Sequence, residues 1–240
     1  MRLIASCVLA SAAILMAAKT ENLHVRVNVA ALDVRGDTVR VAYTVTNAPT
    51  STADLFAFTV DAATHLVEIE RPSRSVAAHT LIAHDFGGRP VASWGFVDPT
   101  IAPAASAPSL AYRAIGLPGL VKYWATPYQA PDTIEAADVS SEELAAGPGA
   151  SAADSGLTVG VVPFPADRSR SALLHRLTTM LDRVCMRGWV DNQGVCNSLR
   201  VKIDHDQMDA LLNELSAQRG KHVNETAYFL LAGNVWALPR

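Results

Sequence analysis

The sequence predicts an α+β protein, in which an N-terminal antiparallel β-sandwich is followed by a small C-terminal α-helical module. Residues 23–130 alternate between apolar and polar side chains, which is the period of a β-strand. From Ser171 the apolar residues recur with the period of an amphipathic helix, up to residue 238. Half of the 240 residues are hydrophobic and 18% are charged, so the chain has enough apolar content for a core and is not a disordered protein.

Residues 1–18 have the pattern of a secretory signal peptide. Arg2 provides a positive charge, the segment from Leu3 to Ala18 is apolar, and polar residues begin at Lys19. A membrane anchor is the alternative, but a spanning helix needs about 20 apolar residues. We therefore expect a secreted or periplasmic protein without a membrane span in the mature chain. The formal net charge of −3 argues against a nucleic-acid-binding protein.

The expected sandwich consists of short strands separated by turns. Val25, Val27 and Val29 share one face of the first strand, and Arg35-Gly36-Asp37 predicts the turn of an antiparallel hairpin. The turns between later strands are expected at Gly-Gly, at Asp-Pro and at Leu117-Pro118-Gly119. Short strands at this spacing are typical of an immunoglobulin-like sandwich. The expected strands are 24–29, 39–45, 55–60, 65–70, 79–85, 91–97, 110–115 and 120–124.

Residues 131–170 are expected to connect the two domains. Ser140 and Glu143 have the spacing of a capping box, which predicts a short helix, and residues 159–162 are a possible extended strand. The module over residues 171–238 begins with a helix whose apolar stripe runs from Leu173 to Val184. A second stripe covers residues 208–215, and Asn224 is the expected N-cap of a last helix.

Cys185 and Cys196 are the two cysteines that remain once Cys7 leaves with the signal peptide. An even pair in an oxidising compartment favours a disulfide over a metal site, which would need further ligands at suitable spacing. We expect Cys185 near the end of the 173–184 helix and Cys196 just past a turn at residues 191–194. Helix, turn and second helix would then fold back, with Trp189 enclosed between them.

The region around this cysteine pair carries a resemblance to a known family. Gly188-Trp189-Val190, Asn197-Ser198-Leu199 and Gln218-Arg219-Gly220 resemble the FIMAH-type domain, a helical module at the C-terminus of secreted bacterial proteins. The resemblance covers about residues 170–238 and implies an accessory or adhesive module with no active site to transfer. The N-terminal half more loosely resembles secreted β-sandwich regions, through Tyr43 to Asn47 and Leu117 to Gly119.

Groups that carry chemistry are few, so we expect no enzyme, no cofactor and no metal site. His84-Asp85 and Asp204-His205-Asp206 are the dense groups of potential ligands, and a metal site needs three or four convergent ligands. No catalytic or phosphate-binding motif is present in the sequence. These groups are therefore interpreted as solvated turn and helix-start residues.

Aromatic residues in the last third of the expected sandwich suggest binding, because aromatic faces stack on sugar rings. The alternative is that they fill the core. The sequence thus favours an exported, non-catalytic binding or adhesive module, with envelope polysaccharide or another surface protein as partner. An unrecognised extracellular hydrolase and a structural subunit of a surface assembly remain alternatives. The aromatic candidates are Trp94, Tyr112, Tyr123, Trp124 and Tyr128.

Overall fold

The structure is a computed structural model, and it describes residues 22–72, 79–86, 89–128 and 152–239. The expected signal peptide and the expected helix at the Ser140 capping box lie outside the described residues. Within them, nine strands precede four helices. The strands are β1 (Val25–Arg35), β2 (Thr38–Asn47), β3 (Leu55–Asp61), β4 (Leu66–Glu70), β5 (His79–Phe86), β6 (Arg89–Asp98), β7 (Ser106–Ile115), β8 (Leu117–Pro127) and β9 (Asp154–Val162). The helices are α2 (Arg170–Met186), α3 (Gln193–Asp204), α4 (Met208–Gln218) and α5 (Glu225–Trp236).

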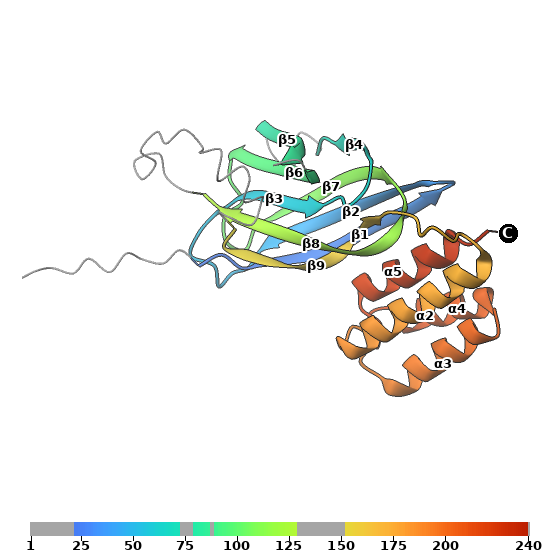
Figure 1. Cartoon of the computed structure of the whole chain (residues 1–240). Coiled ribbons are helices and arrows are strands. Elements are labelled where there is room, and N and C mark those ends of the chain that lie inside the picture. Colours follow the sequence, from blue (N-terminus) through green and yellow to red (C-terminus); the bar gives the residue numbers. More distant parts are fainter. Residues whose placement is uncertain (1–21, 73–78, 87–88, 129–151, 240) are drawn as a thin grey trace, which may run out of the picture.

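The strands form two antiparallel sheets that pack face to face, which confirms the predicted α+β class and the β-sandwich. One sheet has the order β1-β2-β7-β4, and the other has the order β5-β6-β3-β8-β9. The predicted hairpin joins β1 to β2, with Val29 opposite Tyr43 and Gly36 at a φ of +57° in the turn. Figure 1 shows the four helices gathered at one end of the sandwich, beside β1, β8 and β9.

Two parts of the sequence interpretation are wrong. The Leu117-Pro118-Gly119 segment is the start of β8 and not a turn. Proline is tolerated there because this end of β8 pairs only with β9, so no second neighbour needs its missing N–H. The expected connector also contains a full strand, β9, which pairs with β8 along nine residues. Alternation marked part of β9 as extended but gave no partner for it, since strand pairing is a tertiary property.

Aromatic side chains from both sheets fill the centre of the sandwich. Tyr43, Phe58, Trp94 and Tyr112 are fully buried, and the Tyr43 ring lies 5.9 to 6.5 Å from the other three. The two tyrosines also hold β9. The Tyr43 hydroxyl donates to the Val159 carbonyl at 2.7 Å, and the Tyr112 hydroxyl accepts from the N–H of residue 161 at 3.0 Å.

The helices α2, α4 and α5 confirm the expected helical segments. The turn expected at residues 191–194 is wrong in its bounds, because α3 already begins at Gln193 and Cys196 lies in its first turn. Asn192 is the N-cap of α3, because its side-chain oxygen accepts hydrogen bonds from two amides of the first turn. Asn224 caps α5 as predicted, accepting from Ala227 at 2.8 Å. Among the described residues, none of the helices has the length and apolar character of a membrane-spanning helix.

The helical module packs directly on the sandwich through α5, which contacts β1, β8 and β9. Gly233 makes the close approach possible, since a Cβ there would lie 2.8 Å from the Leu32 side chain and 2.9 Å from the Pro118 ring. The Pro118 carbonyl accepts hydrogen bonds from the side chains of both Asn234 and Arg176 at 3.0 Å. Apolar residues of both parts belong to one continuous core.

Candidate functional site

The structure places most of the aromatic binding candidates inside the protein. Trp94 and Tyr112 are fully buried, and Tyr123 and Trp124 are less than a tenth exposed. Tyr128 is more than a third exposed, beyond the end of β8, with its ring 6.3 Å from that of Phe56. Of the two alternatives that the sequence left open, core packing therefore describes Trp94, Tyr112 and Tyr123, whose rings have no face for a ligand.

The potential metal ligands do not converge in the part of the chain that the structure describes. No group of three His, Cys, Asp or Glu side chains has a suitable arrangement there. The His205 ring contacts the Val201 carbonyl at 2.8 Å, and Asp206 pairs with Arg170. The side chains of His84 and Asp85 lie outside the described residues.

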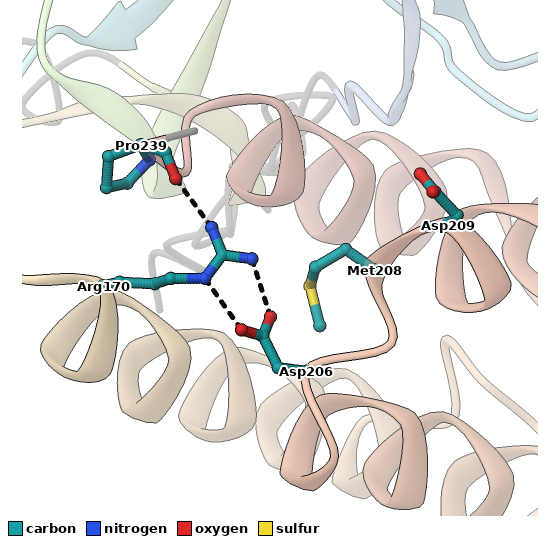
Figure 2. Close-up of a pocket in the computed structure, with 5 residues that line it drawn as sticks. All are labelled: Arg170, Asp206, Met208, Asp209 and Pro239. Carbon is teal, nitrogen blue, oxygen red and sulfur yellow. Dashed lines mark hydrogen bonds and ion pairs between the residues drawn. The ribbon is translucent and has the colours of Figure 1, made fainter.

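A hollow of about 520 Å³ lies beside the start of α2 and Pro239, and the cation that lines it is already paired within the protein. Figure 2 shows the Arg170 side chain between Asp206 and the carbonyl of Pro239. The two Arg170–Asp206 hydrogen bonds measure 2.7 and 2.8 Å, and they lower the pKa of the Asp206 carboxyl. This arrangement fastens the C-terminal residues to α2 and leaves little free donor capacity for a ligand.

A second hollow, of about 450 Å³, lies on the outer face of the four-stranded sheet, where charges are paired across strands. Arg40 donates to both carboxylate oxygens of Glu70, through Nε and one terminal nitrogen, and Arg113 contacts Glu70 at 3.3 Å. These hydrogen bonds raise the pKa of Arg40 and lower that of Glu70. Asp33 lies opposite Arg40 in the register. The neutralised cluster stabilises strand pairing rather than presenting a free charge.

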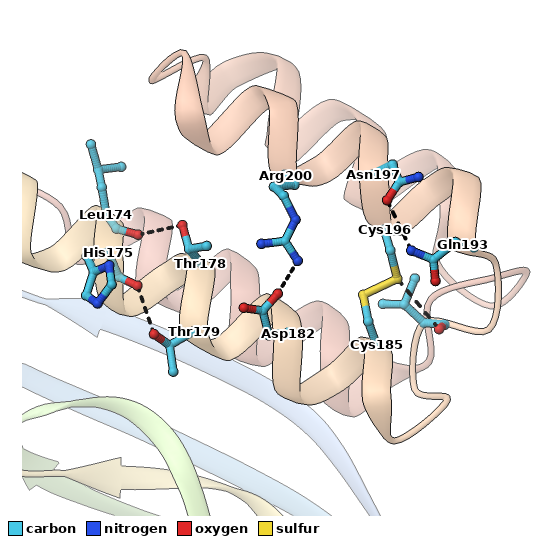
Figure 3. Close-up of polar contacts among 11 residues, drawn as sticks. Leu174, His175, Thr178, Thr179, Asp182, Cys185, Gln193, Cys196, Asn197 and Arg200 are labelled. Carbon is cyan, nitrogen blue, oxygen red and sulfur yellow. Dashed lines mark hydrogen bonds and ion pairs between the residues drawn. A yellow bond between two sulfur atoms is a disulfide. The ribbon is translucent and has the colours of Figure 1, made fainter.

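The predicted disulfide is confirmed. Cys185, at the end of α2, is bonded to Cys196 in α3, and their Cα atoms are 6.3 Å apart. Figure 3 shows this bond together with the Arg200–Asp182 ion pair, which joins the same two helices. Trp189 differs from the expectation, because it is only partly buried and lines a hollow on the sandwich side of the module. The bridge therefore fixes the end of α2 and the turn that presents Trp189.

Two adjoining hollows follow the seam between β9 and the helical module, and both are lined by Leu157. We call them together the junction groove. The first has a volume of about 360 Å³ and the second about 440 Å³. The first is lined by Leu120, Leu157, Arg183, Met186 and Arg187. The second is lined by Val27, Asn28, Leu157, Trp189, Gly220, Asn224, Glu225 and Thr226.

The junction groove combines apolar, aromatic and cationic groups. Met186 is 80% exposed, which is unusual for an apolar side chain, and the Arg187 guanidinium lies 5.7 Å from the centre of the Trp189 ring. Glu225 is paired with Arg219 at the other end of the groove. Neither Arg183 nor Arg187 forms an ion pair with a carboxylate among the residues described. The groove thus offers two free guanidinium groups beside an aromatic face.

Sequence reasoning missed Arg183, Met186 and Arg187 as site residues. Cations in the last turn of a helix complement the helix dipole, so the sequence offers a structural reason for them and none for a site. No protein-family model and no curated protein matches this chain. The assignment of a function therefore rests on the geometry of the groove and on the chemistry of its lining.

Proposed function

We propose that this protein is an exported, non-catalytic binding module that attaches to envelope polysaccharide through the junction groove. In this proposal the sandwich is immunoglobulin-like, the helical part is a FIMAH-like accessory module, and residues 1–18 direct export. A disulfide between Cys185 and Cys196 supports an oxidising compartment, because such bonds do not persist in a reducing cytoplasm.

The observation that carries the proposal is the lining of the junction groove. Binding sites for small molecules and saccharides favour concave seams between structural units, with aromatic surface and a few polar groups. Trp189 provides the aromatic surface, while Asn28 and Thr226 add an amide and a hydroxyl from two different elements. An aromatic face packs against the C–H groups of a sugar ring, and amides and hydroxyls bond its hydroxyl groups.

The same lining favours binding over the alternative of an extracellular hydrolase. Glycoside hydrolysis commonly uses two carboxyl groups about 5 to 10 Å apart. The junction groove contains one carboxylate, Glu225, and Arg219 binds both of its oxygens at 2.9 and 3.0 Å through Nε. Both oxygens of the one carboxylate in the groove are thus engaged by Arg219, and no second carboxyl group among the described residues lines the groove to act with it.

Filling the groove tests the proposal. Asn28 is exposed on β1, so Asn28→Trp introduces a bulky side chain into the groove without disturbing the core. We expect this variant to lose sedimentation with the polysaccharide fraction of the producing cell's envelope. Asn213→Trp makes the same substitution on an exposed position of α4 that lines none of the hollows described, and it should bind normally.

Three results would contradict the proposal. Unchanged sedimentation of Asn28→Trp would show that the groove is not the attachment site. Retention by envelope material after enzymatic removal of its polysaccharide would identify another surface protein as the partner. N-terminal sequencing of the exported protein checks the signal peptide, since recovery of intact Met1 from the cytoplasm would exclude export.

A further inference from the structure

We infer that the polysaccharide bound in the junction groove is acidic and that Arg183 and Arg187 recognise its carboxylate groups. This inference rests on the proposed function and specifies its ligand class. It follows from the distribution of unpaired cations, from the shape of the seam and from the position of the disulfide.

Most cations that the structure describes are already matched by carboxylates. Arg40, Arg113, Arg170, Arg200 and Arg219 all form ion pairs within the protein. Arg183 and Arg187 form no such pair among the described residues. Arg26, Arg71 and Lys221 are unpaired there as well, but only Arg183 and Arg187 line a hollow together. In a chain with a net charge of −3, two adjacent free guanidinium groups form a locally positive surface.

The two arginines are placed to act together. They are four residues apart, one turn of helix, at the C-terminal end of α2, so their side chains leave the same face. Arg176, seven residues before Arg183 on α2, is half-buried, and its pKa is lowered by burial and by the charge of Arg183. A ligand carboxylate relieves this crowding of positive charge, and guanidinium groups bind carboxylates with two parallel hydrogen bonds.

A third free cation extends the positive surface along the sheet. Lys122 on β8 is paired in register with Leu157 on β9, so both side chains lie on the same outer face of the sheet. The Lys122 ammonium is 5.4 Å from the ring centre of Trp124 and has no carboxylate partner among the residues described. Cations therefore follow the seam from α2 onto the sheet, which fits a linear polyanion better than a single anionic group.

The position of Trp189 favours an acidic polysaccharide over other anionic polymers as the ligand. Its ring lines the groove next to Arg187, so a carboxylate bound by the arginine places the attached sugar ring near the aromatic face. Cys185 lies between the two arginines in sequence, and its bond to Cys196 fixes the end of α2, which keeps the cations and the ring in one arrangement. A uronic-acid polymer provides both the carboxylate and the sugar face.

The test compares oligogalacturonate with its fully methyl-esterified form by calorimetry. The protein recovered from the exported fraction should bind the acid form at least about tenfold more tightly than the neutral ester, with affinity that falls as salt rises. The double variant R183Q/R187Q should remove this preference. The control R35Q/R71Q removes the same charge from the four-stranded sheet side of the molecule and should leave it intact.

The possible failures separate the two proposals. Equal binding of the acid and the ester, lost in Asn28→Trp but kept in R183Q/R187Q, would overturn the acidic ligand and leave the saccharide groove standing. Failure of both saccharides and of envelope polysaccharide to bind would overturn the proposed function itself. Binding to vesicles of anionic phospholipid, in the absence of oligogalacturonate binding, would assign the cations to a membrane surface and also overturn the inference.

Discussion

The sandwich and the helical module are stabilised by different means. The sandwich has an interior of large aromatic residues, in which Tyr43, Phe58 and Trp94 lie within about 6.5 Å of one another. The core of the module consists mainly of aliphatic residues such as Leu177 and Leu199, and its helices are joined by a disulfide and by exposed ion pairs. A small unit buries a smaller fraction of its surface, so it depends more on covalent and polar connections.

The largest effect is expected from Trp94→Ala. Trp94 is fully buried and its ring lies 6.0 Å from that of Phe58, so its removal leaves a large cavity. We expect the free energy of unfolding to fall by about 4 kcal/mol. Chemical denaturation followed by circular dichroism measures this change. A loss below about 1 kcal/mol would show that the aromatic centre does not dominate the sandwich.

Removal of the disulfide tests the other half of the comparison. Cys185→Ala with Cys196→Ala frees a loop with a sequence separation of 11, which costs about 3 kcal/mol in the chain-entropy model. We expect hydrogen exchange to quicken over residues 170–238 more than in the sandwich. Equal loosening of both parts would show that the shared core couples them into one cooperative unit. A count of two free thiols in the exported wild-type protein would contradict the bridge itself.

Alkaline pH should weaken the sandwich through Tyr43 and Tyr112, the two tyrosines that are fully buried. Burial raises the pKa of Tyr112 to about 12 and that of Tyr43 well above its usual value. Between about pH 10 and 12 the unfolded chain releases the Tyr112 proton while the folded chain retains it, so stability falls as pH rises across that window. The loss attributable to Tyr112 is at most about 3 kcal/mol.

Denaturation curves of wild type and Tyr112→Phe check this pH dependence. The variant should be less stable at pH 7, because the Val161 amide loses its acceptor, but it should lose less stability between pH 10 and 12. An identical slope in both proteins would mean that Tyr112 does not titrate in this window.

Gly233→Val should loosen the seam that joins the two parts. The added side chain would meet Leu32 and Pro118, and overpacking of this kind costs about 2 kcal/mol. Ala217→Val adds the same branched side chain at an exposed position of α4 and should cost much less. Faster hydrogen exchange in α5 and β1 is the expected readout. A Gly233→Val protein as stable as Ala217→Val would show that the seam accommodates the extra volume.

The smallest effect, and the one stabilising change, is expected from Thr158→Val. The Thr158 hydroxyl is buried in β9 without a hydrogen-bond partner among the described residues. A methyl group of similar size removes this cost and should raise the free energy of unfolding by about 1 kcal/mol. In contrast, Thr178→Val removes a hydroxyl that donates to the Leu174 carbonyl, so it should not stabilise. Thermal unfolding of the two variants distinguishes them.

The sequence by itself determined the local elements. Alternation located β1 to β8, the helical period located α2, α4 and α5, and Asn224 was recognisable as an N-cap. The disulfide followed from the cysteine count and the expected compartment. The strands, helices and N-cap depend on neighbours within a few residues, and the disulfide depends on the one pair of cysteines left after the signal peptide. Pattern and composition are therefore sufficient to predict them.

Only the tertiary structure decided the remainder. It placed β9 beside β8 although 26 residues separate Pro127 from Asp154, and it set Gly233 against Leu32. The junction groove has the same origin. Leu157 belongs to β9, Arg187 to the end of α2 and Asn28 to β1, and no local pattern relates them. They meet because both parts bury apolar surface at one seam, and burial is non-directional and unrelated to distance along the chain.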